Sequence, residues 1–98
     1  MEWINVNDKH FVDIKHFEDG TYEWKANKNF PNKPFLVGIF SYNKITEEFT
    51  DFNYWLVFLG DYGLQEFTED GTVNFPCFSI LDIEYWCEVK PPKKIVNN

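Results

Sequence analysis

The tetrapeptide Glu-Asp-Gly-Thr occurs twice in the chain, at residues 18–21 and 69–72, and each copy separates two strand-like segments. An Asp-Gly pair between alternating apolar runs is a strong short-range signal for a β-hairpin, because glycine readily adopts the positive φ angles of tight turns. The residues around the two copies do not repeat. We therefore interpret them as one turn chemistry used twice, with Gly20 and Gly71 as structural residues.

Short strand-like segments between turns account for most of the remaining chain. Two of them, Phe35-Leu36-Val37-Gly38-Ile39-Phe40 and Tyr54-Trp55-Leu56-Val57-Phe58-Leu59, are apolar on both faces. Such runs predict central strands that are covered on both sides, with Phe35, Phe40, Trp55 and Phe58 in the core. The predicted fold class is mostly β, an antiparallel sheet built from hairpins.

Residues 45–52 leave an alternative open. As a short helix, this segment would place Glu47, Glu48 and Asp51 on one side, with its apolar residues on the other and Thr46 as a cap. The alternative fold class is therefore α+β, with one short helix near residues 45–52.

The length of 98 residues suits a single core. We expect one β-rich domain over residues 1–92, which ends at Pro91-Pro92, and a flexible C-terminal tail over residues 93–98. The aromatic content of 20% argues against disorder. We interpret Cys77 and Cys87 as reduced packing residues. With no membrane span or signal peptide expected, we predict a cytoplasmic protein.

The charge balance restricts the class of partner. The chain has nine lysines, no arginine and sixteen acids, which gives a formal net charge of −7. Arginine is the residue that most often reads guanine edges, and an acidic surface repels the phosphate backbone. We therefore expect no direct sequence-specific nucleic-acid binding and no membrane partner. A basic protein surface, or a ribonucleoprotein with such a surface, is the expected partner.

The acids concentrate between Glu47 and Glu88, a stretch with ten acids and no basic residue. This stretch is either a solvated surface or an anionic face directed at a basic cleft. Several aromatic residues stand beside these acids, which suits a protein-binding face or a half-buried sheet. The candidate partner-binding residues are Glu47, Glu48, Asp51, Asp61, Tyr62, Glu66, Glu69 and Asp70.

The sequence gives little support for catalysis. His10 and His16 would lie about 20 Å apart on one strand, too far to chelate one metal. No Cys-x-x-Cys, His-Glu-x-x-His or glycine-rich phosphate loop is found. We expect no enzyme activity, no catalytic residues, no metal, no cofactor and no small-molecule substrate.

The two ends of the chain carry a more specific pattern. Residues 2–8, Glu-Trp-Ile-Asn-Val-Asn-Asp, resemble the opening Trp-Ile-x-Val-x-Asp/Glu of a short phage and prophage family of unknown function. Residues 83–92 resemble its closing pattern, in which a tryptophan precedes Pro-Pro. Family members have Leu-Pro near Lys9 and histidine where this chain has Tyr85. Independently of the family, we expect structural roles for Trp3 and Trp86 on paired terminal strands.

The resemblance implies an accessory protein of a mobile element, which would act in the cytoplasm of a bacterial host. We expect a non-enzymatic inhibitor of a host defence effector, of the anti-CRISPR type. An RNA-guided RNase is one target of such an inhibitor. Such effectors hold guide and target in positively charged channels, which an acidic and aromatic-rich face would bind. The alternative is a phage structural or assembly protein without an inhibitory role.

Overall fold

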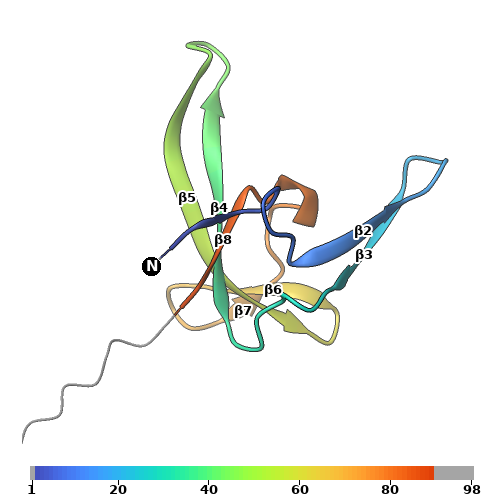
Figure 1. Ribbon diagram of the computed structural model, residues 1–98. Helices are drawn as coiled ribbons and strands as arrows, with labels where there is room; N and C mark the ends of the chain where they lie inside the picture. Colours follow the sequence, from blue (N-terminus) through green and yellow to red (C-terminus); the bar gives the residue numbers. More distant parts are fainter. Residues whose placement is uncertain (1, 90–98) are drawn as a thin grey trace, which may run out of the picture.

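The computed structural model describes residues 2–89. About half of these residues form β-strands, and turns and loops make up most of the rest (Figure 1). Six strands form one sheet in the order β1-β8-β4-β5-β6-β7, and every neighbouring pair is antiparallel. Strands β2 and β3 form a separate hairpin. The bounds are β1 Ile4–Asn5, β2 Val12–His16, β3 Tyr22–Ala26, β4 Phe35–Asn43, β5 Glu48–Gly60, β6 Gly63–Phe67, β7 Val73–Asn74 and β8 Tyr85–Glu88.

The mostly β prediction is confirmed, and the alternative helix near residues 45–52 is wrong. Residues 44–47 form the turn between β4 and β5, and β5 begins at Glu48. Tyr42 lies opposite Phe49, with ring centroids 5.2 Å apart. Such cross-strand aromatic pairs stabilise a hairpin and are not available to a helix. In the described residues the one helical element is the 3-10 helix η1, Ile80–Asp82, which Ser79 and Asp82 close with a capping box.

The two Glu-Asp-Gly-Thr segments form the same turn. Gly20 and Gly71 have φ angles of +88° and +84°. In the first turn the Gly20 N–H donates to Phe17 O, and in the second the Gly71 N–H donates to Thr68 O. Each loop therefore contains three residues and ends in a left-handed glycine, a common hairpin connection.

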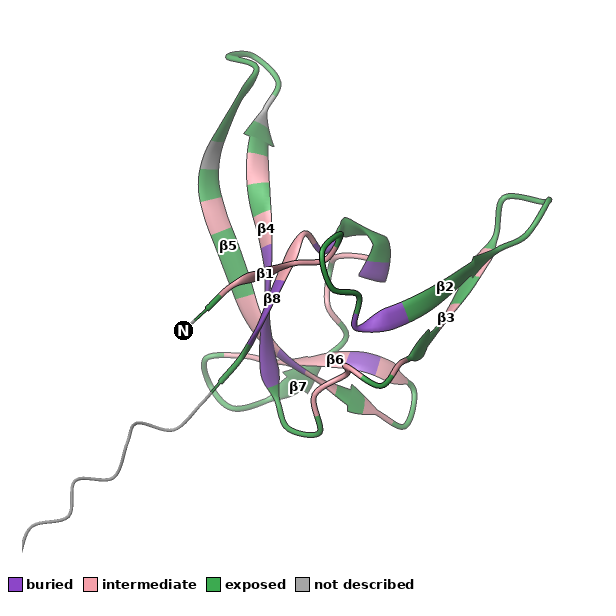
Figure 2. Cartoon of the chain, viewed as in Figure 1, coloured by how far each residue is buried: buried purple, intermediate pink, exposed green. Residues whose placement is uncertain are grey.

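The core lies on one face of the six-stranded sheet. Phe35, Val37 and Val57 have no exposed surface, and Trp86 is 1% exposed. Residues from the β2–β3 side and from η1 cover this face, Phe11, Val12 and Ile80 among them. Figure 2 shows that the buried residues gather where the sheet meets these segments. Burial of each large side chain contributes roughly 1.5–3 kcal/mol.

The prediction that both apolar runs are covered on two sides is wrong for the far part of β4 and for both ends of the β5 run. In that run Tyr54 is 62% exposed and Leu59 is 48% exposed. Phe35 is buried, but Phe40 is 38% exposed and is not a core residue. β8 pairs with β4 only over Phe35–Gly38, and β6 pairs with β5 only over Val57–Gly60. Residues 39–53, called the arm below, therefore project from the body of the molecule as a two-stranded hairpin (Figure 1).

The terminal strands pair as expected. β1 lies against β8, with Ile4 opposite Trp86 and Asn5 opposite Tyr85. The predicted end of the domain at Pro91-Pro92 and the predicted tail, residues 93–98, lie outside the described residues.

Candidate protein-binding site

The structure divides the predicted partner-binding residues into three groups. Glu47, Glu48 and Asp51 lie at the outer end of the arm, and all three are exposed. Asp61 and Tyr62 form the turn between β5 and β6, where Tyr62 is 85% exposed. The third group lies on β6 and the β6–β7 turn and consists of Glu66, Glu69 and Asp70, of which Glu66 is half-buried opposite Val57.

These groups do not form one continuous surface. Glu48 and Gly60 begin and end β5, so the arm acids and the Asp61 turn lie about 40 Å apart along the strand, at ~3.3 Å per residue. Asp61 and Asp70 lie beyond opposite ends of β6. A continuous acidic segment of sequence thus becomes separate patches, because long strands carry neighbouring turns apart.

The arm combines its acids with a row of aromatic side chains. We call this set the aromatic row: Trp3, Phe40, Tyr42, Phe49, Phe52, Tyr54 and Tyr85. Phe52 lies at its centre, with ring centroids 4.9 Å from Trp3 and 4.8 Å from Phe40. Ring-to-ring contacts connect all seven residues of the row, so the row is continuous.

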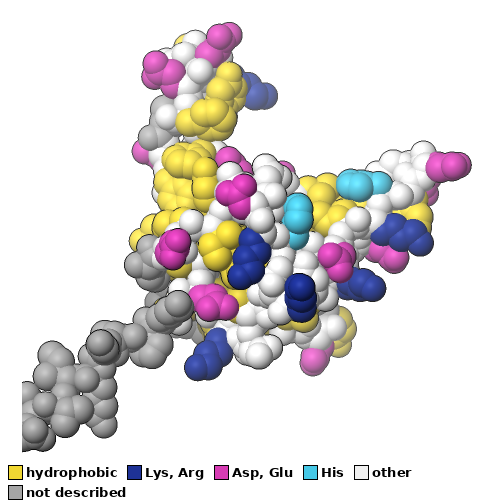
Figure 3. All heavy atoms as spheres, viewed as in Figure 1, with side chains coloured by type: hydrophobic (Ala, Val, Ile, Leu, Met, Phe, Trp, Pro, Cys, Tyr) yellow, Lys and Arg dark blue, Asp and Glu magenta, His cyan; other side chains and the backbone are white. Residues whose placement is uncertain are grey.

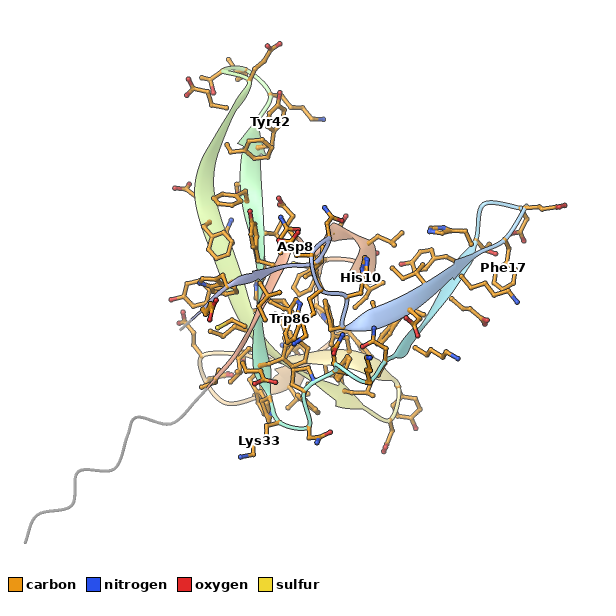
Figure 4. All side chains as sticks on the ribbon, viewed as in Figure 1. Asp8, His10, Phe17, Lys33, Tyr42 and Trp86 are labelled. Atoms are coloured by element: carbon orange, nitrogen blue, oxygen red, sulfur yellow. The ribbon has the colours of Figure 1, made fainter. Side chains whose placement is uncertain are left out.

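The aromatic row lies on the sheet face opposite the core. Phe40 pairs with Phe52 and Gly38 with Tyr54, whereas the core residue Val37 lies on the alternate positions of β4. Phe49 and Tyr54 are 65% and 62% exposed, and Tyr42 is 51% exposed. Hydrophobic side chains gather along the arm in Figure 3, and Tyr42 lies towards its outer end in Figure 4. Contiguous exposed apolar surface of this kind marks interaction sites.

The acids of the arm lie beside this row but on the other face of the hairpin. Asp51 pairs with Ser41, one position away from the Phe40–Phe52 pair, so its side chain points to the opposite side. Acidic side chains also gather at the tip of the arm (Figure 3). The arm therefore presents an aromatic face and an acidic face on one thin ribbon.

Glu47 has a distinctive backbone conformation at the tip. Its φ angle is +56°, in the left-handed region that non-glycine residues rarely adopt. Among the described residues other than glycine it is the one with positive φ. The left-handed residue closes the four-residue loop between β4 and β5 and costs roughly 1–2 kcal/mol.

In the β6–β7 turn, Asp70 accepts hydrogen bonds from other residues of the same turn. Asp70 Oδ1 accepts hydrogen bonds from the Thr68 hydroxyl, the Thr72 hydroxyl and the Thr72 N–H. These bonds favour the ionised carboxylate and lower the pKa of Asp70 to about 2, with the Thr68 hydroxyl as the largest cause. In the matching turn the Thr21 hydroxyl and N–H lower the pKa of Asp19. The hydrogen bonds that Asp70 Oδ1 accepts therefore come from residues of its own turn.

The tryptophans Trp86 and Trp3 lie on opposite faces of the sheet, Trp86 in the core and Trp3 in the aromatic row. The ring of Trp86 is almost fully buried, and its Nε1–H donates to Lys9 O over 2.9 Å. Phe11 packs against the same ring with centroids 5.7 Å apart. Trp3, on the other face, contacts Phe52 and Tyr54. The two tryptophans therefore anchor opposite faces of the sheet, and Trp86 lies near the centre of the molecule (Figure 4).

Sequence reasoning missed most of the aromatic row as a site. The available signal was the alternation of aromatic and polar residues in Phe40-Ser41-Tyr42-Asn43 and in Asp51-Phe52-Asn53-Tyr54. Two facing segments with this period predict one aromatic face once they are assigned to strands. The prediction for the cysteines was half wrong, because Cys87 is buried and Cys77 is exposed.

Comparisons with known protein families, with curated proteins and with solved structures found no match for this chain. The resemblance of the chain ends to a phage and prophage family therefore stays a prediction. Within residues 2–89, no group of three or more His, Cys, Asp or Glu side chains is arranged to hold a metal ion. That part of the chain also contains no helix with the length and apolar character that a membrane crossing requires.

Proposed function

We propose that the protein is a non-enzymatic binding protein whose arm docks on a basic surface of a protein partner. The observation that carries this proposal is the exposed aromatic row with acids on the same ribbon. Tyrosine, phenylalanine and tryptophan supply contact area at interfaces, and carboxylates select a partner rich in lysine or arginine. The β6–β7 group has fewer exposed aromatic neighbours, so the arm is the primary contact.

The distribution of charge also supports the arm as the contact with a basic partner. Five of the six lysines among the described residues lie within residues 9–33, and Lys44 is the sixth. Residues 44–89 contain that one lysine and ten acids, a net charge of −9. Three of these acids, Glu47, Glu48 and Asp51, lie on the arm. Together with Lys44 they give residues 39–53 a net charge of −2, which attracts a basic partner.

The specific partner that we propose is a host defence effector that handles nucleic acid, so that the protein acts as an anti-CRISPR type inhibitor in a bacterial cytoplasm. The support is the acidic character of the arm together with the resemblance of the chain ends to phage and prophage proteins. An RNA-guided RNase has the positively charged channel that this arm would enter. Binding there would compete with guide or target.

The experiment compares three forms of the protein in parallel captures from a bacterial host. The arm variant carries Glu47→Lys, Glu48→Lys and Asp51→Lys. The matched control carries the same number of charge reversals outside the arm, Glu66→Lys, Glu69→Lys and Glu88→Lys. We expect a basic, nucleic-acid-handling protein to be retained by the native chain and the control but lost from the arm variant. Equal retention by the arm variant would refute the proposed site, and purified effector whose RNase activity is unaffected by the native chain would refute the proposed inhibition.

The exposed aromatic row also favours a second candidate, a structural or assembly component of a phage particle. Subunit packing would cover Phe49, Tyr54 and Tyr42 in the same way as a host partner. Sedimentation separates the two candidates, because an assembly component self-associates at high concentration and an inhibitor of a host protein stays monomeric.

A further inference from the structure

Strand β5 has an open edge along the arm. It runs for 13 residues, but on the side away from β4 only Val57–Gly60 pair with β6. No strand within residues 2–89 pairs with residues 48–56 on that side. The opposite edge of the arm is partly closed, because the Glu84 carboxylate accepts the Phe40 N–H over 2.9 Å. Proteins commonly block strand edges in this way to prevent unwanted pairing, and here one edge is left unblocked.

The direction of the peptide groups on β5 follows from the contacts of Glu84. Its N–H donates to Gly38 O, and its carboxylate accepts the Phe40 N–H, so the peptide groups of residues 38 and 40 point away from β5. Tyr54 lies opposite Gly38, and Phe52 lies opposite Phe40. Directly opposite residues of an antiparallel pair either exchange both hydrogen bonds or exchange neither. The N–H and C=O groups of Phe52 and Tyr54 therefore point to the open edge.

The side chains along this edge alternate in chemistry. Phe52 and Tyr54 lie on the aromatic face, and Asp51 and Asn53 lie on the other face. An added strand places its own side chains beside these residues, alternately on one face and on the other. Apolar side chains are favoured next to Phe52 and Tyr54, and cationic side chains are favoured on the face of Asp51.

We propose that the open edge of β5 binds an extended segment of the partner as an additional antiparallel strand, and that basic and apolar residues alternate in this segment. The proposal rests on the proposed function, since it takes the partner to be a basic protein. It adds the mode of recognition, strand addition, in which backbone hydrogen bonds supply affinity and alternate side chains supply specificity.

The probe is a capped eight-residue peptide of alternating lysine and valine, titrated by calorimetry at fixed low salt. A peptide of the same composition in the order Lys-Lys-Val-Val, repeated, is the matched control. We expect saturable binding of the alternating peptide and at least about tenfold weaker binding of the control, a difference of 1.4 kcal/mol. Absence of saturable binding of the alternating peptide below about 1 mM overturns the proposal.

Two methylated peptides test the backbone hydrogen bonds directly. In an added antiparallel strand, the residues opposite Phe52 and Tyr54 carry their side chains on the aromatic face and direct their N–H groups at β5. N-methylation of the valines should therefore weaken binding at least about tenfold, whereas the same number of methyl groups on the lysines should leave it within about twofold. Equal effects of the two patterns overturn strand addition.

Protein variants separate this proposal from the proposed function. Asp51→Lys should weaken binding of the alternating peptide. Glu18→Lys, the same reversal of charge at an exposed residue of the β2–β3 turn, should leave it unchanged. If Asp51→Lys weakens binding but the methylated peptides behave alike, the arm still selects a basic partner and strand addition is wrong. If the protein alone forms a dimer that the peptide dissociates, a second copy occupies the edge and the proposed occupant is wrong. Equal effects of Asp51→Lys and Glu18→Lys overturn both proposals.

Discussion

The ring of Phe52 lies directly over Gly38, so closely that a Cβ atom on residue 38 would lie 2.1 Å from Phe52 Cζ. Gly38 is the strand position opposite Tyr54, one residue before the arm begins. The absence of a side chain there lets Phe52 pack across β4 and reach Trp3 and Tyr85. The closeness of the aromatic row to the sheet therefore depends on this glycine.

Substitution of Gly38 should destabilise the protein through this contact. We expect Gly38→Ala to lower the free energy of unfolding by about 1–3 kcal/mol, because the Phe52 ring must move. In the Phe52→Ala background the same change should cost at least about 0.5 kcal/mol less. Denaturant unfolding of the four proteins in this cycle measures the coupling. An identical cost in both backgrounds would show that Phe52 is not the obstacle.

The buried hydrogen bond of Trp86 gives a second prediction. Trp86→Phe removes the Nε1–H donor and leaves Lys9 O without it, so we expect a loss of about 1–3 kcal/mol. Trp3→Phe is the matched control, because Trp3 is only partly buried and lies outside the core. Its cost should be smaller. The prediction fails if thermal unfolding gives the two variants the same stability.

The depressed pKa of Asp70 predicts a dependence on acid. A carboxylate whose pKa is lower in the folded state contributes stability at pH values above its ordinary pKa, 3.8, and that contribution is lost as the pH falls towards about 2. Asp19 acts in the same direction. We therefore expect the free energy of unfolding to decrease between about pH 5 and pH 2.

A substitution in one turn isolates the cause of this pKa. Thr68→Val removes the hydroxyl that donates to Asp70 and should raise the pKa of Asp70 towards its ordinary value. The pKa of Asp19 should not change, because its hydroxyl donor is Thr21 in the other turn. NMR titration of both carboxyl carbons measures this. A parallel shift at Asp19 would mean that the effect is not local.

The left-handed backbone of Glu47 predicts a stabilising substitution. Glu47→Gly should raise the free energy of unfolding by about 0.5–1 kcal/mol, since glycine tolerates positive φ although it loses more entropy on folding. Glu47→Ala removes the same charge and keeps the strain, so it should give no such gain. Chemical denaturation of both variants distinguishes relief of strain from loss of charge.

Association with the basic partner should weaken as ionic strength rises. Surface charges are screened over about 8 Å at physiological salt, so the attraction to the arm acids decreases steeply with added salt. The arm variant with Glu47, Glu48 and Asp51 changed to lysine should lose most of this dependence. Binding constants at several salt concentrations test it, and an equal slope for native and arm variant would place the contact elsewhere.

The sequence predicts the hairpins of this fold better than it predicts the arm. The Asp-Gly turns and the paired terminal strands follow from local chemistry around Gly20, Gly71 and Trp86, and the structure contains all three features. Which face of β4 is covered depends on long-range packing by Phe11 and its neighbours, which no local pattern specifies. For that reason the local pattern places Phe40 in the core, and it allows a helix at residues 45–52, where the arm turns.

The residue types of the candidate site could be predicted from the sequence, but their arrangement in space could not. The acids from Glu47 to Asp70 belong to one stretch of sequence, yet the length of β5 separates those of the arm from those beyond its other end. Their association with aromatic residues could be seen from neighbours such as Phe49. The continuity of the aromatic row could not, because Trp3 and Tyr85 join it from the two ends of the chain.

The division of the β4–β5 hairpin at Gly38 has an evolutionary consequence. Phe35, Val37 and Val57 belong to the core, whereas residues 39–53 pair only with one another and contribute no residue to the buried cluster. Apart from Phe40 and Phe52, which contact residues outside the arm, the arm can therefore accumulate substitutions with little cost to folding. Selection can alter what the arm recognises while the remaining sheet is conserved, and homologues that share the body should differ most in these fifteen residues.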